Sequence, residues 1–264
     1  MHGRRLEPVH LVFAALGGLV LLFIVAPLVG MLLASSPAEL SETARDPEVI
    51  GSIRLTLLTS MGATLLFAVA AVPFAYLLAR KNFPLKQLVN GLVDLPIVIP
   101  HSAAGIALLG IISRGTLLGE LGESVGMRFV GGHAGIMAAM AFVSVPFLVN
   151  AARDGFAAVP ERLEKAALNL GASPLRVFLT ISVPIAWRSI LSGLILMWAR
   201  GMSEFGAVLV VAYHPIITPV LIYERFGAFG LRYARPISVL FIGICLAFFV
   251  VLRVVARRRG HAEG

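Results

Sequence analysis

The sequence is poor in charged residues and contains only one cysteine. Asp, Glu, Lys and Arg together make up 14% of the 264 residues, whereas hydrophobic residues make up 58%. The mean hydropathy of +0.92 exceeds what a soluble core requires, so the composition indicates a polytopic membrane protein. Because Cys245 is the sole cysteine, an intrachain disulfide and a cysteine-based metal cluster are both excluded.

Sequence motifs for catalysis and nucleotide binding are also missing. No G-x-x-x-x-G-K-[ST] phosphate loop occurs, so an ATP-driven function would borrow a nucleotide site from another chain. Asp94, His101 and Ser102 lie close together, but no G-x-S-x-G nucleophile elbow accompanies them. His101 has no second metal ligand at a usable spacing. We therefore expect no catalytic residue, no metal site and no cofactor bound by this chain.

The hydrophobic residues form six long runs, and a span across a bilayer takes about 20 residues. The first run is longer than the apolar part of a secretion signal, about 7–15 residues, so we interpret it as a retained span. The expected fold is an all-α integral membrane protein with one domain over residues 1–264. Its predicted spans lie near 9–34, 51–79, 87–113, 131–156, 185–212 and 236–255. The stretches 35–50, 114–130 and 213–235 are expected to be external loops.

The formal net charge of +8 comes from basic residues that cluster beside the apolar runs, a distribution that does not suit a nucleic-acid surface. Such clusters mark the cytoplasmic flanks of membrane spans. Both chain ends and residues 157–184 are therefore predicted on the cytoplasmic side of a multi-pass protein of the cell membrane, in contact with lipid. The flanking basic residues include Arg4, Arg5, Arg80, Lys81, Lys86, Arg153 and Arg257–Arg259.

Residues 159–184, VPERLEKAALNLGASPLRVFLTISVP, interrupt the apolar sequence with small and charged side chains. Pro160 suits the first position of a helix, and Glu161 places a negative charge in its first turn. Gly171 can adopt the left-handed conformation that ends this helix, and Ser173 can cap a second one. We therefore predict two short helices with a break between them.

One face of the first of these helices is expected to carry Leu163, Ala166, Ala167 and Leu170, and its small residues allow a partner to approach closely. Four charged residues keep the helix out of lipid, namely Glu161, Arg162, Glu164 and Lys165. The pattern predicts an element that docks on a partner in the aqueous phase. An ordinary cytoplasmic hairpin between two membrane helices is the alternative interpretation.

The same segment resembles the EAA loop in the permease subunits of ABC importers. The matching residues are Ala166, Ala167, Gly171, Ile181 and Pro184, whereas Val183 replaces a common Leu. The resemblance implies that residues 157–184 form the coupling loop, whose helix sits in a cleft of the ATP-hydrolysing subunit. Lys165 stands where the family usually has an acidic residue, and Glu164 lies one place earlier. It stays open which of these two side chains pairs with the ATPase.

Two prolines, Pro96 and Pro100, interrupt the third apolar run, where a helix is expected to kink or unwind. For the nearby Asp94, a role as an interfacial cap is favoured over a proton relay. The stretch resembles the LP-x-x-x-P-P segment of molybdate, tungstate and sulfate permeases, with His101 in place of the second paired proline. We expect His101 to be a hydrogen-bonded residue at the helix break and not a metal ligand.

In the fifth run, Arg200 and Glu204 can pair at a spacing of i and i+4 on a helix. The sequence around them resembles the R-x-x-G/S-E-F-G-A run in the fifth helix of molybdate and sulfate permeases. Intramembrane charges usually face a pathway, although a salt bridge that only braces the helix remains an alternative. The residues expected to line or gate the pathway are Arg200, Ser203, Glu204, Pro96, Pro100 and His101.

These resemblances together imply the permease subunit of an ABC importer that moves a tetrahedral oxyanion inward. Molybdate or tungstate is the expected cargo, with sulfate or another anion as the alternative. The implied assembly is a homodimer with two ATPase subunits, which hold ATP and Mg on the cytoplasmic side, and an external substrate-binding protein. An ion-coupled secondary transporter would need midplane coupling residues and usually internal repeats, and neither is evident in the sequence.

Overall fold

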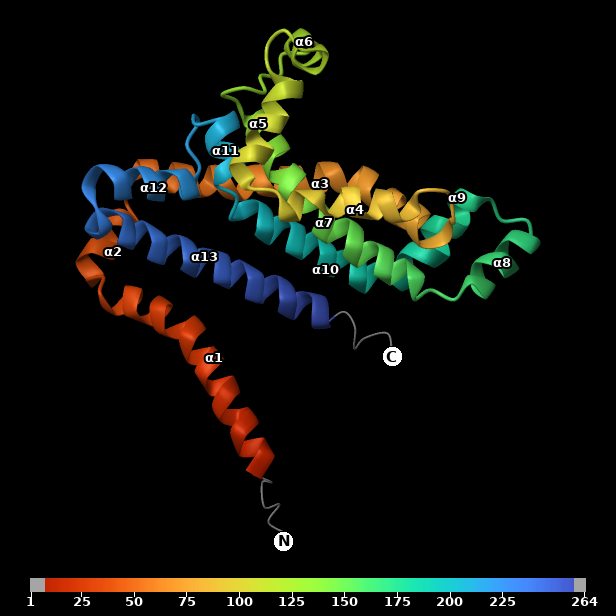
Figure 1. Ribbon diagram of the computed structural model, residues 1–264, viewed down its shortest axis with the longest axis horizontal. Coiled ribbons are helices and arrows are strands. Elements are labelled where there is room, and N and C mark those ends of the chain that lie inside the picture. The colour runs from red at the N-terminus through yellow and green to blue at the C-terminus, as the bar shows by residue number, and fades with distance from the viewer. Residues whose placement is uncertain (1–7, 259–264) are drawn as a thin grey trace.

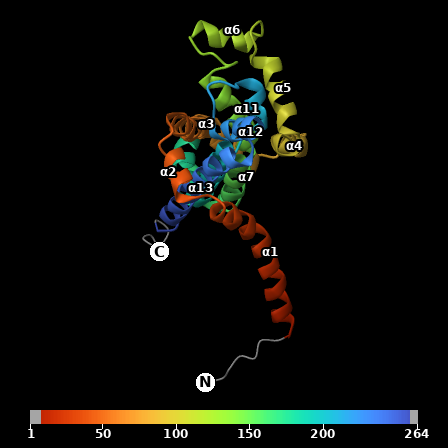
Figure 2. The ribbon, with the colours of Figure 1, turned by 90° about the vertical axis from the view of Figure 1, so that its left-hand side faces the viewer.

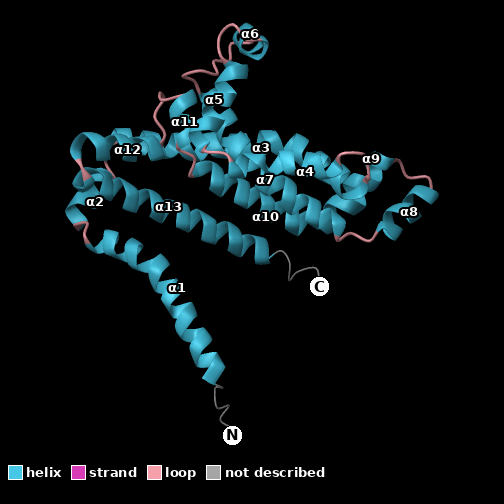
Figure 3. Cartoon of the chain, viewed as in Figure 1, coloured by secondary structure: helices cyan, strands magenta, loops and turns pink. Residues whose placement is uncertain are grey.

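The computed structural model describes residues 8–258, and every regular element within that range is a helix (Figures 1 and 3). The all-α prediction is thereby confirmed. The elements are α1 Pro8–Leu33, α2 Pro37–Thr43, α3 Pro47–Arg80, α4 Lys86–Val98, α5 His101–Ile112, α6 Leu117–Ser124, α7 His133–Ala157, α8 Glu161–Asn169, α9 Pro174–Val177, a π-helix Phe178–Ser182, α10 Val183–Met202, α11 Gly206–Val211, α12 Thr218–Phe229 and α13 Leu231–Arg258.

The core of the molecule is a bundle in which α3 and α10 both pack against α7 along the long axis (Figure 1). The side chains of α7 supply much of the buried surface, including Ile136, Met140, Leu148 and Phe156. Small residues bring α10 close to α7, because a Cβ atom on Gly155 would lie 2.4 Å from Cβ of Ser189. Close backbone approach of this kind is typical of helix packing in membranes.

Five described helical segments are long and apolar enough to cross a membrane, namely Val9–Leu33, Pro47–Arg80, His133–Ala157, Pro174–Met202 and Leu231–Leu252. A sixth span is possible as the pair α4 and α5, which is bent by 115° at its break. The number of spans therefore agrees with the expectation of six. Their cytoplasmic or external orientation stays a prediction, and the flanking Arg4, Arg5 and Arg259 lie outside the described residues.

Two of the predicted spans are not continuous helices. The third is broken between Val98 and His101, as the prolines indicated. The fifth was predicted to continue to Ala212 and is wrong beyond Met202, because the chain leaves the helix there and forms α11 in a new direction. The short helices α5 and α11 pack side by side and cross the direction of the bundle (Figures 1 and 2).

The three predicted external loops are also partly helical, which corrects the loop expectation. Residues 35–50 form α2 and the first turn of α3, residues 114–130 contain α6, and residues 213–235 contain α12. The polar residues that suggested loops act as helix caps. Ser36 accepts a hydrogen bond from the backbone of Glu39, and Asp46 accepts one from Glu48. Such capping satisfies the free N–H groups of a first helical turn.

Helix α1 stands apart from the rest of the molecule, as Figure 2 shows. Its side chains are exposed along almost the whole helix, and its few contacts include α13. The helix is apolar on every side, with a mean hydropathy of 2.7 over its most apolar stretch. A helix of this kind is suited to contact with lipid or with other helices in the membrane.

Candidate functional site

Residues from two broken helices meet where α10 ends and α5 begins, and we call His101, Arg200, Ser203 and Glu204 the break cluster. Ser203 ends α10, and the carboxylate of Glu204 accepts a hydrogen bond of 2.8 Å from the backbone N–H of Ala207 in the first turn of α11. Glu204 is thus the residue that turns the chain from α10 into α11. The sequence suggested that Glu204 and Arg200 lie on the same helix, but Glu204 lies just beyond the end of α10.

The predicted ion pair between Arg200 and Glu204 is present, with 3.0 Å between Nη2 and Oε2. The same Nη2 lies 2.7 Å from Nε2 of His101, and Nη1 lies 3.4 Å from Oγ of Ser203. His101 is therefore a hydrogen-bonded residue at the break. Close packing sets its position, because a Cβ atom on Gly206 would lie 2.9 Å from Cβ of His101.

The members of the break cluster differ in how far they reach the surface of the chain. The side chain of Glu204 has no exposed surface, whereas 21% of the Arg200 side chain and 41% of the His101 side chain are exposed. Ser203 is exposed as well. The cluster therefore buries its carboxylate and leaves parts of His101, Arg200 and Ser203 at the surface of the chain. In the membrane, such a face requires a polar neighbour or an aqueous path in place of lipid.

The two prolines of the third run lie next to the helix break, but their side chains make no hydrogen bonds with the break cluster. Pro96 lies buried inside α4, and Pro100 is the residue immediately before α5. Pro100 thereby places His101 in the first turn of α5. The exposed position of Pro100 leaves it on the surface beside the cluster, whereas Pro96 contributes to the packing of α4.

Asp94 accepts a hydrogen bond of 2.6 Å from Nδ2 of Asn150 on α7. Sequence reasoning missed Asn150, because it lies inside an apolar run with no motif around it. The Oδ1 atom of Asn150 is buried without a hydrogen-bond partner among the described residues. This contact joins α4 to α7. Along the chain, Pro96 and the end of α4 lie between Asp94 and the break cluster.

The predicted coupling loop, residues 157–184, contains two short helices with a break, as expected. Gly171 has a φ of +88°, the left-handed conformation expected of the residue that ends a helix. Ser173 caps α9 by accepting a hydrogen bond of 3.3 Å from the backbone N–H of Arg176. One detail differs, because Pro160 stands at the cap position before α8, and Glu161 is the first helical residue.

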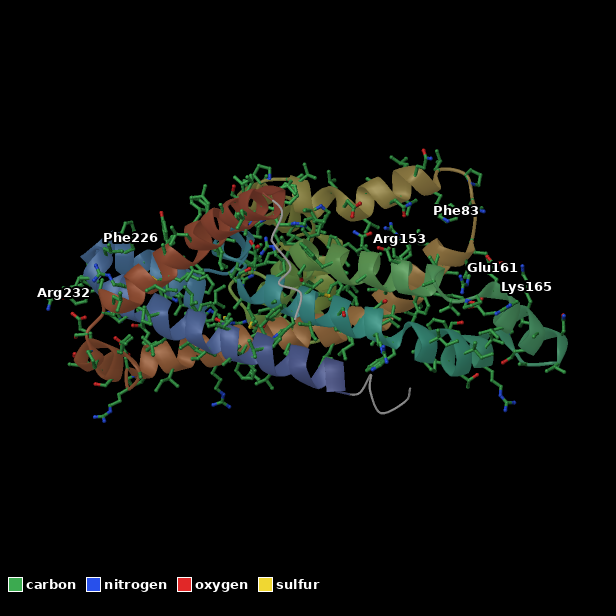
Figure 4. All side chains as sticks on the ribbon, turned by 90° about the horizontal axis from the view of Figure 1, so that it is seen from below. Phe83, Arg153, Glu161, Lys165, Phe226 and Arg232 are labelled. Atoms are coloured by element: carbon green, nitrogen blue, oxygen red, sulfur yellow. The ribbon has the colours of Figure 1, made fainter. Side chains whose placement is uncertain are left out.

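The outer face of α8 is apolar and exposed. Leu163 is 42% exposed, Leu170 is 89% exposed, and Ala166 also lies on the surface. Ala167 is half-buried. Glu161 and Lys165 form an exposed ion pair of 2.8 Å at the far end of the bundle (Figure 4). The hydrogen bond from Lys165 and its positive charge hold the pKa of Glu161 below its ordinary value.

Glu164 turns the opposite way, into the chain. Its carboxylate accepts hydrogen bonds of 2.9 Å from Nε of Arg80, 2.9 Å from Nη2 of Arg80 and 2.7 Å from Oγ of Ser182. Burial raises the pKa of Glu164, but the hydrogen bonds from Arg80, Ser182 and Tyr76 and the charge of Arg80 outweigh burial and lower it overall. Among the predicted coupling residues, Glu164 is therefore the one that is buried against the rest of the chain.

Arg80 is a residue of this region whose partner the sequence did not reveal. It was recognised only as a basic flank of the second span, although its guanidinium also donates a hydrogen bond of 2.8 Å to the carbonyl of Val159. Three aromatic rings support this corner of the molecule. The Tyr76 ring lies 5.3 Å from that of Phe156 and 5.0 Å from that of Phe178, both in edge-on contacts.

Comparison with known proteins places the chain in a family. The chain belongs to the family of binding-protein-dependent transport system inner membrane components, which matches residues 71–261. It is therefore a permease subunit of the ABC importer class and a multi-pass protein of the cell membrane. The break cluster, residues 71–80 of α3 and the predicted coupling loop all lie inside the matched range.

Individual relatives extend this similarity over most of the chain. The chain is 47% identical to a molybdate/tungstate transport system permease protein of Thermococcus kodakarensis, over 94% of this chain and 96% of the relative. A probable sulfate transport system permease protein of Chlorokybus atmophyticus is 33% identical over 78% of this chain and 73% of its own length. A bacterial ABC transporter involved in the import of the acidic polysaccharide alginate shares the fold, with a TM-score of 0.72 at 17% identity over 94% of this chain and 95% of its own.

Proposed function

We propose that this chain carries a tetrahedral oxyanion, molybdate or tungstate, inward across the cell membrane. The observation that carries the proposal is the partly exposed guanidinium of Arg200 inside a membrane span, beside the imidazole of His101. An intramembrane cation is costly in lipid and marks an ion or substrate path by default. Arg200 offers several N–H donors to an anion whose charge is spread over oxygens at its surface.

The position of the break cluster supports a path between two copies of the chain. The side chains of His101 and Ser203 and part of the Arg200 side chain reach the surface of the single chain. A second copy related by two-fold symmetry would place an equivalent group opposite, so a homodimer would enclose the path and keep these groups away from lipid. The path in this proposal runs between the two clusters and not through one chain.

The coupling loop supports ATP-driven transport. Its exposed apolar residues Leu163, Ala166 and Leu170 suit a cleft in an ATPase subunit, with Glu161 and Lys165 at the rim. We propose that two such subunits hold ATP and Mg on the cytoplasmic side and that an external substrate-binding protein delivers the anion. The N-terminus and the C-terminus then both lie in the cytoplasm. The chain itself supplies no catalytic residue and holds no cofactor in this mechanism.

Sulfate is the second candidate cargo, because it is also a tetrahedral dianion and would meet the same donors. The closer similarity is to a molybdate/tungstate permease, at 47% identity against 33% for the sulfate relative. A binding protein that encloses the anion would discriminate between anions of different size better than an open path would. We therefore propose molybdate or tungstate for the intact transporter and place the selection on its binding protein.

Uptake by the reconstituted transporter tests this function. Vesicles that hold the chain with its ATPase and binding protein, with ATP on the ATPase side, should accumulate molybdate and tungstate and should take up sulfate at least tenfold more slowly. Arg200→Met should abolish uptake, whereas Arg114→Gln, which removes an exposed guanidinium of the α6 region, should not. Sulfate uptake as fast as molybdate uptake would overturn the proposed cargo. ATP-independent uptake would overturn the transporter class.

A further inference from the structure

Arg80, the last residue of α3, holds together four separate parts of the chain. Its guanidinium grips the carboxylate of Glu164 with two parallel hydrogen bonds, each 2.9 Å long, and reaches the carbonyl of Val159 at 2.8 Å. The carboxylate in turn accepts 2.7 Å and 3.3 Å hydrogen bonds from the hydroxyls of Ser182 and Tyr76. We call Tyr76, Arg80, Val159, Glu164 and Ser182 the Arg80 clamp.

Both side chains of this ion pair are buried, in contrast to the exposed ion pairs of the molecule. The side chains of Arg80 and Glu164 are 8% and 9% exposed, whereas those of Arg114 and Glu123 are 78% and 46% exposed. An exposed pair is loosely held and contributes little to a fixed geometry. A buried two-bond contact between a guanidinium and a carboxylate fixes both distance and orientation, because the two planar groups must stay aligned.

The members of the clamp come from both ends of the coupling loop and from its middle. Val159 lies at the entry, Glu164 lies within α8, and Ser182 is the last residue of the π-helix that leads directly into α10. A π-helix is an irregular element that occurs frequently at functional sites. The clamp therefore fastens the loop at three points to the end of α3.

The two helices that leave the clamp lead to the break cluster. Helix α10 runs from Val183 to Met202, which is about 30 Å at 1.5 Å per residue, and carries Arg200 near its far end. Helix α3 runs beside it, and a Cβ atom on Gly201 would lie 3.5 Å from Cβ of Ser60. These two packed helices therefore connect the coupling loop to the proposed path.

We propose that Arg80 and Glu164 are positioning residues that convert movement of the coupling helix into movement of α3 and α10. This inference rests on the proposed function. It adds which residues transmit movement from the coupling helix to the membrane spans. With the clamp intact, a force that an ATPase applies to α8 acts on the spans. Without the clamp, α8 would shift while α3 and α10 stayed in place, and ATP hydrolysis would continue without transport.

The ratio of anions taken up to ATP hydrolysed tests the clamp, because this ratio does not depend on how much protein folds. Arg80→Ala and Glu164→Gln should each lower the ratio at least tenfold in vesicles while the ATPase still co-purifies with the chain. Arg80→Lys keeps the charge but cannot hold both carboxylate oxygens and the Val159 carbonyl at once, so it should lower the ratio by a smaller factor. The Arg80→Ala/Glu164→Gln double variant should be no worse than either single variant.

The matched control is Lys86→Gln, which removes a positive charge just beyond α3 where the ammonium makes an exposed 3.3 Å hydrogen bond to Asn82. This variant should keep the parent ratio. Ratios within twofold of the parent for both Arg80→Ala and Glu164→Gln would overturn the clamp. Failure of the unaltered chain to transport anions would instead count against the proposed function.

A measurement without ATPase or substrate tests the same link. Spin labels on cysteines at Leu88 and Leu170, two exposed positions, would be introduced into chains that carry Cys245→Ser. The distribution of distances between the labels should be narrow in the parent and in Lys86→Gln, and clearly broader in Glu164→Gln and Arg80→Lys. Equal widths in all four proteins would show that the clamp does not hold α8 and would overturn the proposal.

Discussion

At the scale of single residues, the direction in which a side chain points decides its role. Residue types and spacing placed Glu164 and Lys165 together as candidates for an ATPase contact. The fold separates them, because Glu164 turns inward to Arg80 and Lys165 turns outward to Glu161. The sequence could not predict this, since the partner of Glu164 lies 84 positions away on another helix. The pairing of Arg200 with Glu204 was predictable because it is local.

The inward pairing of Glu164 predicts a specific dependence of stability on pH. Its pKa lies below the ordinary value of 4.5, so the pair stabilises the fold above about pH 4.5 and loses this contribution as the pH falls through the lowered pKa. Glu164→Gln leaves Arg80 buried without a counter-charge and should cost about 3–5 kcal/mol at neutral pH.

Thermal unfolding of the purified chain in detergent, measured across the acidic range, checks this expectation. The difference in stability between parent and Glu164→Gln should be largest at neutral pH and should shrink below about pH 4.5. Other acidic groups titrate in both proteins and cancel in the difference. A difference that stays constant down to acidic pH would contradict an ionised Glu164 in the folded state.

A second prediction at the residue scale concerns Arg200 and Glu204. It distinguishes a role in the transport pathway from a purely structural role. Arg200→Met leaves the fully buried carboxylate of Glu204 unpaired, which should cost about 3–5 kcal/mol. Arg200→Met/Glu204→Gln should recover much of that stability, because Gln is neutral and its carbonyl can still accept the Ala207 N–H that starts α11. The recovered protein should nevertheless fail to transport, since the partly exposed cation is gone.

Thermal stability of the complex and anion uptake, measured on the same preparations, decide between the two roles. Glu204→Gln alone is the matched control, because it keeps Arg200 and the cap. A double variant that is both stable and fully active would show that Arg200 and Glu204 only brace the chain. That outcome would also remove the main support for a path beside the break cluster.

At the scale of elements, the sequence predicted where helices break better than where they begin. Pro100 and Gly171 mark breaks through their own backbone restrictions, and both breaks are present. The end of α10 was missed because Ser203 and Glu204 are compatible with a continuing helix, and only the capping of Ala207 and the packing of Gly206 on His101 turn the chain. Helices α2, α6 and α12 were missed because capping residues resemble loop residues in composition.

The left-handed Gly171 gives a prediction for the coupling loop as an element. A Cβ atom there would meet no other atom within 4 Å, so any effect of a substitution arises from the backbone conformation alone. Gly171→Val should strain the φ of +88°, by about 1–2 kcal/mol, and shift α8 relative to α9. Association of the ATPase or ATP hydrolysis linked to transport should fall, while the membrane bundle stays folded.

Co-purification of the ATPase with the chain and anion uptake in vesicles measure this effect. Gly171→Asn is the graded comparison, because Asn tolerates the left-handed conformation better than Val and should keep more activity. A bulky residue at the half-buried Ala167, such as Ala167→Phe, should block docking through size instead. Normal coupled transport by both Gly171→Val and Ala167→Phe would refute the docking role of α8.

At the scale of the whole molecule, the number of spans followed from hydropathy, whereas their arrangement did not. The bent pair α4 and α5 and the sideways course of α5 and α11 depend on packing between breaks that lie about a hundred residues apart, as between His101 and Gly206. Hydropathy records only that a segment avoids water. It carries no signal for the angle at which a segment leaves the bundle.

The orientation of the whole molecule in the membrane yields the last prediction. Helices α2 and α8 lie at opposite ends of the long axis (Figure 1), so a bilayer across the bundle would separate them. Basic flanks such as Arg80 and Lys86 predict that α8 faces the cytoplasm. In chains that carry Cys245→Ser, a cysteine at Glu42 should react with a membrane-impermeant maleimide on intact cells, and one at Leu170 only after the membrane is opened. Both positions are exposed, so accessibility within the chain does not limit the reaction. Reaction of both from outside would contradict cytoplasmic coupling, because α8 could not then reach an ATPase that uses cellular ATP.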